Sequence, residues 1–398
     1  MRDDAVAGTG AGVLPVVPVR ARGLTIEGAD GRRYLDCVSG AGALPLGHNH
    51  PVALRAIREV LDTGAPLQVA GLTTPVEEAF VAELMRALPP ALADRARVRF
   101  CDPAGKNPVA TAAGLVRAAT GRTRVIHFTD ADADADPDHA ARPGLTDPGS
   151  AEALPAGMLL DPVRCRDGVL PTPDAVLRRL RHGTAERSVP LIVDETETGV
   201  GRTGTFWAFG YSGVVPDVLV LSKAIGGGLP LAAVVYHDDL HRGEESAFRG
   251  NQLALAAGAA TLAHVREHGL AEHAAALGVR TLARLRGLAE DFHCVGDVCG
   301  LGLMIGIELT APDGTADAAP RGVRPGTAAA VQRECLRRGL IVDLAGPTGN
   351  VVRLLPPLIV TEEQMSAVLD RLADAVQAVE RVSGGHAPPR GVRAARRL

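Results

Sequence analysis

Two lysines are the residues of this sequence with the clearest potential for chemistry. Of the 42 Lys and Arg residues in the chain, only Lys106 and Lys223 are lysines. Arginine stays protonated and is a poor nucleophile, whereas a lysine amine in a shielded site can lose its proton and form a Schiff base with a carbonyl compound. A chain that uses arginine almost everywhere else therefore keeps lysine where arginine cannot serve.

Lys223 lies at the end of an apolar run and directly before a turn. Residues Val218–Ser222 have the composition of a buried strand, and Gly226–Gly228 supply a turn after the lysine. This order indicates a strand that delivers the lysine into a loop at its carboxyl end, where open α/β sheets bind ligands. We predict that Lys223 is the catalytic amine. The alternative is a surface lysine without a chemical role.

An acidic residue ends a second predicted strand. Residues Pro190–Asp194 form an apolar run that stops at Asp194, and the glycine-rich segment Glu195–Gly204 follows. A carboxylate close to a Schiff-base lysine can keep a pyridinium nitrogen protonated, so that the ring acts as an electron sink. Asp194 and Lys223 together therefore favour chemistry on a pyridine-type cofactor.

The composition bounds the class of protein. A chain of 398 residues can bury a large core in two or three domains, and with 46% hydrophobic but only 3% aromatic residues that core must be aliphatic. The net charge of -4 argues against nucleic-acid binding, and no apolar run is long enough to predict a membrane span. The start of the sequence does not read as a signal peptide, and its six cysteines form no CxxC pair. We expect free thiols in a cytoplasmic protein.

Apolar runs alternate with helical patterns along the chain, which predicts α/β layers around a largely parallel sheet. The predicted strands are 97–101, 124–128, 190–194, 217–222, 231–236, 295–310 and 351–355, and the predicted helices are 108–119, 251–290 and 361–382. At the start of the last helix, Thr361 followed by Glu363 and Gln364 offers capping chemistry.

These features resemble the class III aminotransferases of pyridoxal-phosphate fold type I. The pair Asp194 and Lys223, each followed by a glycine-rich turn, carries the resemblance, which extends over nearly the whole chain. Other segments resemble the N-terminal hairpin of that family, its substrate-carboxylate segment and motifs of its diaminobutyrate–2-oxoglutarate aminotransferase branch. They are Asp30–Asp36, Val352–Leu358, Gly40–Leu44, Gly47–Pro51 and Phe248–Ala254.

The resemblance implies an α/β fold, with a large domain built on a mostly parallel sheet and a small α+β C-terminal domain. The expected boundaries are an N-terminal segment, 1–44, that packs on the small domain, the large domain at 45–290, the small domain at 291–385 and a disordered basic tail at 386–398.

It also implies pyridoxal 5'-phosphate as cofactor and a role for several residues. Lys223 would hold the cofactor covalently, Asp194 would keep the ring nitrogen protonated, and Glu197 stands where the family has a glutamine near the ring hydroxyl. Arg353 matches the arginine that takes a substrate carboxylate. The phosphate would bind at the start of a helix, next to Gly105, Lys106 and Asn107.

Several positions depart from the family pattern around the cofactor. The segment 102–108 reads Asp-Pro-Ala-Gly-Lys-Asn-Pro, whereas the family reads roughly Gly-Pro-Ser-Gly-Thr-Asp-Ala, so two hydroxyls are lost and Lys106 replaces one of them. Ala247 replaces a threonine that usually reaches the phosphate bound by the partner subunit, and no aromatic residue follows Phe128 to stack on the ring. Each lost charge-assisted hydrogen bond weakens cofactor binding by about 1.5–3 kcal/mol.

A further departure affects the substrate. In an ungapped comparison, Arg166 replaces the glutamate that pairs with the carboxylate-binding arginine. Arg353 would then face a second cation, and the pair would favour an acidic ligand and handle an amine poorly.

Two functions follow from this mixture of kept and lost residues. The first is transfer of an amino group between a diamino acid or related amine and a 2-oxo acid, as in diaminobutyrate–2-oxoglutarate aminotransferases. The alternative is a repurposed aminotransferase fold from specialised metabolism that binds the cofactor weakly or not at all, and does another reaction or acts as a partner subunit.

The resemblance also implies a homodimer with a small-molecule substrate, and the charge and hydropathy given above predict neither a nucleic-acid nor a membrane partner. We assign no metal site. The alternating aspartates of Asp130–Asp138 lack the glycine and glutamate of a calcium loop. His48 and His50 have no third ligand nearby in the sequence, which favours a role in a turn or an interface over metal binding.

Overall fold

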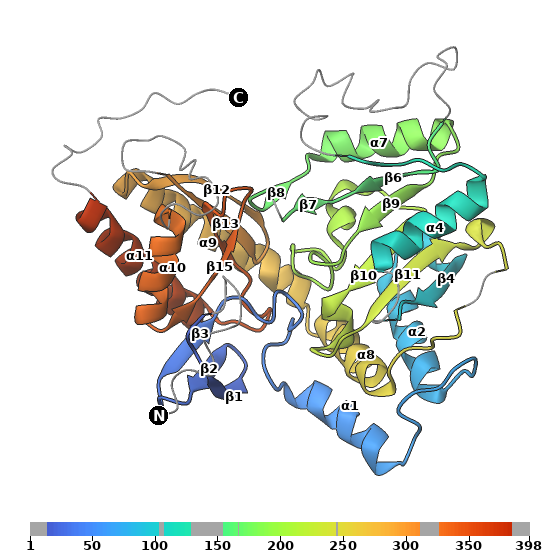
Figure 1. Ribbon diagram of the computed structural model, residues 1–398, viewed down its shortest axis with the longest axis horizontal. Coiled ribbons are helices and arrows are strands. Elements are labelled where there is room, and N and C mark those ends of the chain that lie inside the picture. Colours follow the sequence, from blue (N-terminus) through green and yellow to red (C-terminus); the bar gives the residue numbers. More distant parts are fainter. Residues whose placement is uncertain are drawn as a thin grey trace, which may run out of the picture.

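A six-stranded sheet forms the centre of the larger part of the molecule (Figure 1). The structure is a computed structural model that describes residues 14–102, 107–128, 154–165, 167–243, 246–310 and 326–383. The strands of the sheet, in spatial order, are β4 (Ala96–Phe100), β11 (Ala232–His237), β10 (Val218–Ser222), β9 (Leu191–Asp194), β6 (Gly157–Leu160) and β5 (Val125–His127). Only β11 runs antiparallel to its neighbours, so the prediction of a largely parallel sheet is confirmed.

Helices cover both faces of this sheet, which explains why its strands are apolar without interruption. Val220 of β10 lies in a core cluster with residues of α4 (Pro108–Thr120), whereas the next residue, Leu221, lies in the opposite cluster with residues of α2 (Pro75–Ala87). Other helical elements of this part are α1 (Pro51–Asp62), α3 (Pro90–Ala93), α7 (Asp174–Glu186) and α8 (Gln252–Glu267), with the short turns η1 (Ala208–Ser212), η2 (Lys223–Gly226) and η3 (Asp238–Leu240).

A second sheet lies in the C-terminal part and is antiparallel throughout. Its strands, in spatial order, are β12 (Val295–Leu301), β13 (Met304–Leu309), β16 (Val351–Leu354) and β15 (Asp343–Ala345). Helices α9 (Leu270–Asp291) and α10 (Thr327–Arg337) pack against it, and α11 (Glu362–Ser383) packs against both helices.

The N-terminal strands form a third sheet with a strand from the C-terminal part. Strands β1 (Pro18–Arg22), β2 (Thr25–Gly28) and β3 (Arg33–Asp36) make an antiparallel meander, and β14 (Leu340–Ile341) adds to β3 in parallel. Hydrogen bonds therefore join the first described segment of the chain to its C-terminal region, while the exact domain boundaries stay a prediction.

A short hairpin connects the large sheet with the C-terminal sheet. It consists of β7 (Val163–Arg164) and β8 (Leu170–Pro171), and its turn lies so close to β13 that a Cβ on Gly306 would come within 2.4 Å of the carbonyl oxygen of Gly168. This contact needs glycine at position 306, and it holds the hairpin between the two sheets.

The predicted elements are present, with ends that differ by a few residues at most. The helical stretch 251–290 is two helices, because Gly269 adopts a left-handed conformation between them, and the stretch 295–310 is a two-stranded hairpin. The capping interaction of α11 is confirmed, since the backbone N–H of Gln364 donates to Thr361 Oγ1 and that of Thr361 donates to Gln364 Oε1. The Asp130–Asp138 run and the basic tail lie outside the described residues. No helix in the described ranges is long and apolar enough to cross a membrane.

Candidate active site

Lys223 lies where the sequence predicted, at the carboxyl end of β10. Its backbone has a φ of 55°, which is uncommon for a residue with a side chain and is held here by the turn of η2. The side chain is 33% exposed and lines a cavity of about 460 Å³ with Ser222, Gly228 and Asn107. The amine can therefore meet a ligand from solvent.

Asp194 lies one strand away, at the carboxyl end of β9, and faces a second cavity of about 440 Å³. Its Oδ1 accepts the backbone N–H of Thr196 at 2.9 Å. Burial raises the pKa of this carboxyl, because a charged group in a shielded site loses solvation. A carboxylate in such a place is stabilised most by a cationic N–H group. The sequence predicted such a partner for Asp194, the protonated nitrogen of a pyridine ring.

Two side chains at the ends of the next strands face the same cavity. His127 of β5 and Asp161, which follows β6, lie 3.1 Å apart across the sheet edge. Parallel strands end at one edge, so β5, β6, β9 and β10 all direct functional groups to one place. The sequence reasoning assigned no role to His127.

Glu197 makes the central contacts of the site. Its Oε1 pairs with Lys223 Nζ, and its Oε2 accepts from Arg353 Nη1 at 3.0 Å. Burial alone would raise the pKa of Glu197, but the hydrogen bond and charge of Lys223, helped by Arg353, outweigh burial and hold it below the ordinary value. Glu197 is therefore an anion that bridges two cations.

Arg353 comes from β16 of the C-terminal sheet and is only 9% exposed. Its Nη2 donates to Asp343 on β15, the residue directly across the strand pair. Burial alone would lower the pKa of Arg353, but Glu197 and Asp343 outweigh it and raise the pKa, so the guanidinium stays charged. Asp343 was missed in the sequence, because its only signal is the pairing of β15 with β16.

The expectation that Arg353 lacks an acidic partner is wrong for the described residues, whereas its predicted contact with Arg166 stays a prediction. Two carboxylates, Glu197 and Asp343, contact its guanidinium. The acidic partners of Arg353 come from a different loop and from a neighbouring strand, which no single aligned position reveals. Arg166 itself lies outside the described residues.

The start of α4 lies between the two cavities, as the predicted phosphate site requires. Asn107 lines both cavities and caps the helix by accepting the backbone N–H of Ala110 at 2.7 Å, and Pro108 fills the first turn. Pro108 has no N–H and the N–H of Ala110 is taken by Asn107, so the attraction of this end for an anion rests mainly on the helix dipole. Gly105 and Lys106, the other predicted phosphate residues, lie outside the described residues.

Cys165 is a further residue of the site that the sequence did not single out. Its thiol lies 3.8 Å from the sulfur of Met304, and burial, followed by the charge of Glu197, raises its pKa well above the ordinary value. Cys165 is therefore a neutral thiol that adds an apolar wall beside Glu197 and Arg353.

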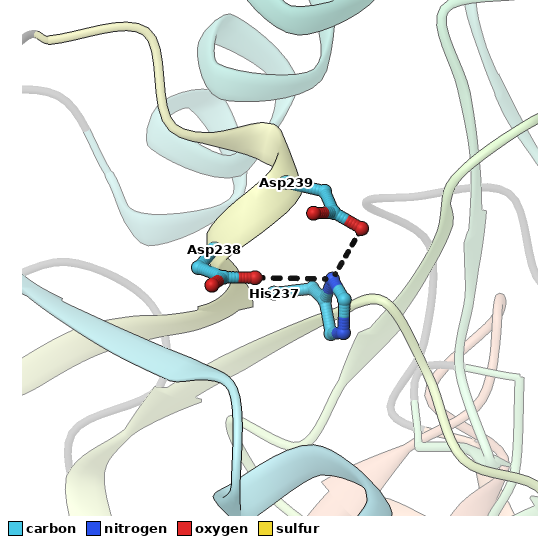
Figure 2. Close-up of side chains that lie close together, drawn as sticks. All are labelled: His237, Asp238 and Asp239. Carbon is cyan, nitrogen blue, oxygen red and sulfur yellow. Dashed lines mark ion pairs between the residues drawn. The ribbon is translucent and has the colours of Figure 1, made fainter.

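One group of His and Asp side chains in the described residues is close enough to hold a cation, and it lies away from this site. Figure 2 shows His237 with Asp238 and Asp239, whose ion pairs measure 3.6 and 3.2 Å. Arg95 pairs with both carboxylates and offsets part of their charge. Because β11 is antiparallel, its last residue lies at the sheet edge opposite Lys223, where these ion pairs connect η3 to the chain before β4.

The two histidines considered in the sequence separate in the structure. His48 pairs with Asp36 at 2.8 Å, whereas the ring of His50 lies 4.9 Å from that of His264 on α8. His48 thus joins its turn to the N-terminal sheet, and His50 helps to pack α1 on α8.

Comparisons with known proteins agree with this geometry. The model of the class-III aminotransferase family matches residues 6–131 and 151–376. A diaminobutyrate–2-oxoglutarate aminotransferase of Rhizobium meliloti is 38% identical over 92% of this chain and 89% of its own length, and that of Haemophilus influenzae is 32% identical over 91% and 90%. An acetylornithine aminotransferase of Mycolicibacterium smegmatis is 33% identical over 93% and 96%.

The fold also matches solved structures. The ornithine aminotransferase of Plasmodium yoelii superposes with a TM-score of 0.77 at 24% identity, over 92% of this chain and 95% of that one. A transaminase from the marine bacterium Virgibacillus gives a TM-score of 0.81 at 19% identity, over 93% and 94%.

Proposed function

The chain belongs to the class-III aminotransferase family, and from this premise we propose that it transfers an amino group from a diamino acid to a 2-oxo acid. The curated relatives named above support 2,4-diaminobutyrate and 2-oxoglutarate as the substrate pair. The observation that carries the proposal is the placement of Lys223 and Asp194 at the ends of adjacent parallel strands. Asp194 and Glu197 line one cavity, Lys223 lines the next, and the ion pair of Lys223 with Glu197 joins the two.

Members of this family depend on pyridoxal 5'-phosphate, and the described residues fit that cofactor. Lys223 offers an amine for its aldehyde, Asp194 offers a half-buried carboxylate for its ring nitrogen, and the N-terminus of α4 at Asn107 offers the positive end of a helix dipole for its phosphate. When bound, the cofactor supplies an electron sink for the carbon from which a proton is removed.

Three side chains have separate roles in the reaction, namely proton transfer, stabilisation of the ring nitrogen and binding of the substrate carboxylate. With the cofactor bound, the free amine of Lys223 would accept a proton from the substrate carbon and return it to the carbon on the other side of the transferred nitrogen. Asp194 would stabilise a proton on the ring nitrogen, because its half-buried carboxylate has no other cation within hydrogen-bonding distance among the described residues. Arg353 binds a substrate carboxylate, since its guanidinium stays charged.

A coupled assay tests this function. Purified protein mixed with pyridoxal phosphate is expected to form glutamate from 2,4-diaminobutyrate and 2-oxoglutarate, and borohydride is expected to fix the cofactor on the peptide that contains Lys223. A protein that takes up no cofactor at saturation would point to the repurposed fold instead.

We also propose a cytoplasmic homodimer. The six thiols are free, as expected in a reducing compartment. The Phe248–Gln252 loop would contribute to the partner's cofactor pocket, as the resemblance of this segment to its family implies. Light scattering at micromolar concentration tests the dimer, and a monomer would contradict it.

A further inference from the structure

Glu197 lines the cavity of about 440 Å³ and forms an adjacent pair of opposite charges with the buried Arg353. The carboxylate and the guanidinium are joined at 3.0 Å, and Arg353 is anchored from behind by Asp343. Of the two oxygens of Glu197, Oε2 takes Arg353 and Oε1 takes Lys223. Oε1 is therefore the one that changes partner when Lys223 reacts.

The charges of this cluster balance only while Lys223 is an ammonium ion. Lys223 and Arg353 contribute two positive charges, and Glu197 and Asp343 contribute two negative ones. Covalent attachment of an aldehyde removes the primary ammonium of Lys223 with its three N–H donors. The bonded nitrogen keeps at most one N–H, so Glu197 Oε1 loses most of its contact with Lys223 in a half-buried place where an unpaired carboxylate is costly.

We propose that Glu197 then binds the α-ammonium group of the substrate while Arg353 binds its α-carboxylate. A neighbouring acceptor and donor, 3.0 Å apart, complement the two charged groups on the α-carbon of an amino acid. The inference rests on the proposed function and narrows its substrate class. The reacting amine is at one end of the substrate. The other end carries a free α-ammonium and a free α-carboxylate on one carbon, and this group is called the amino-acid head below.

This pair discriminates between amine donors of similar length. A diamino acid with a free α-amine satisfies both Glu197 and Arg353. An ω-amino acid without an α-amine leaves Glu197 unpaired, and an Nα-acetylated diamino acid has no charge to offer it. A dicarboxylate, including the 2-oxo acid acceptor, places a second anion beside Glu197, so Glu197 favours the diamino acid over it without excluding it. Glu197 is thus a specificity-determining residue for the donor.

A binding experiment without cofactor tests the pair directly. In Lys223→Ala, Glu197 Oε1 has lost its ammonium partner. L-2-aminobutyrate, which has the amino-acid head, is expected to bind this variant about tenfold or more tightly than butyrate, as titration calorimetry measures. Adding Glu197→Gln is expected to remove that preference and to strengthen binding of glutarate. A merely structural effect would weaken all three ligands together.

Glu197→Asp is the second variant, because it keeps the charge and is expected to keep part of the preference. Thermal melting shows that each variant is folded. Equal binding of 2-aminobutyrate and butyrate to Lys223→Ala, or a preference that survives Glu197→Gln, would overturn the proposal.

Kinetics of the protein with pyridoxal phosphate separate this inference from the proposed function. The wild type is expected to have a kcat/KM for 2,4-diaminobutyrate at least about tenfold above those for γ-aminobutyrate and Nα-acetyl-2,4-diaminobutyrate. Equal values would leave the aminotransferase intact and overturn the specificity pair. If no donor reacts, the proposed function fails, and the calorimetric preference alone decides whether Glu197 and Arg353 bind an amino-acid head.

Discussion

An arginine at position 223 could keep the positive charge of Lys223 but not its nucleophilic amine. Its ammonium pairs with Glu197, and an arginine could make the same ion pair. Only the lysine amine can lose its proton and bond to an aldehyde. The charge of this residue and its nucleophilicity can therefore be separated by a single substitution.

We expect Lys223→Arg to remain folded, with a melting temperature within a few degrees of the wild type, and to lose covalent attachment of pyridoxal phosphate. Absorbance titration and borohydride fixation measure the attachment. Lys106→Arg is the matched control, because Lys106 is the other lysine of the chain and this variant is expected to keep the attachment at Lys223. Attachment that persists in Lys223→Arg would remove the role given to Lys223.

The residues that the sequence predicted are those with a local signal. Lys223 and Asp194 each end an apolar run, and Arg353 lies in a recognisable segment, so all three could be placed without a structure. Asp343 could not, because only the pairing of β15 with β16 brings it to Arg353. The bridging role of Glu197 was also missed, since one of its partners comes from a different sheet.

Glu195, next to Asp194, is buried and makes stability depend on pH. Burial raises its pKa from 4.5 to about 8, while its oxygens accept from Thr198 and from the backbone N–H of Phe209. The folded state therefore binds a proton that the unfolded state releases between these two pH values. This contribution to stability is fully present below pH 4.5 and is lost as the pH rises to about 8.

Glu195→Gln is expected to flatten this part of the stability profile. The amide oxygen can accept from Phe209 and the amide nitrogen can donate to Thr198, so both contacts survive without a charge. The variant should melt at a higher temperature than the wild type at pH 8, and the difference should shrink toward pH 5. Melting curves across pH 5–9 measure it, and parallel profiles for the two proteins would show that Glu195 is not the titrating group.

Among the elements, the turn after β10 depends on Gly227. This residue has a φ of 59°, and a Cβ there would lie 2.6 Å from the carbonyl oxygen of Ala257 on α8. The turn can therefore pack on α8 only with glycine at this position, and that packing fixes the direction in which β10 presents Lys223.

We expect Gly227→Ala to destabilise the protein by more than the roughly 1–2 kcal/mol that a left-handed alanine costs, because the clash with α8 adds to it. Cofactor attachment should weaken as η2 shifts. Gly64→Ala is the matched control, with a φ of 66° but no atom within 4 Å of the added carbon. Urea unfolding measures both variants, and equal losses of stability would show that contact with α8 is unimportant.

The elements themselves were largely predictable, because long apolar runs and helical periods are local signals. The short strands β14 and β15 were not predicted, since β14 has two residues and β15 has three, and each is defined by its partner in another part of the chain. The contacts within the site were not predictable for the same reason, because they join residues of different sheets and leave no local signal in the sequence.

At the scale of the whole molecule, the site exists only while the two large sheets keep their relative positions. Glu197 follows a strand of the parallel sheet, whereas Arg353 lies on the antiparallel one. Arg202, only 2% exposed, joins the two parts, because its Nη1 donates to the carbonyl oxygens of Pro356 and Leu303 and its own carbonyl accepts from the N–H of Leu303. Arg202 lies in the glycine-rich segment seen in the sequence, but its role as a connector had no local signal.

Arg202→Ala is therefore expected to reduce both stability and ligand binding. It leaves a cavity and removes the side-chain donor from two buried carbonyl oxygens, so unfolding in urea should show a loss of roughly 3–5 kcal/mol. Arg284→Ala removes an exposed arginine that pairs with Asp370, and it should cost about 0.5 kcal/mol or less. Binding of butyrate at Arg353 should weaken in Arg202→Ala and stay unchanged in Arg284→Ala. Unchanged butyrate binding in a destabilised Arg202→Ala would show that other contacts hold the sheets in register, and that the position of Arg353 relative to Glu197 does not depend on this arginine.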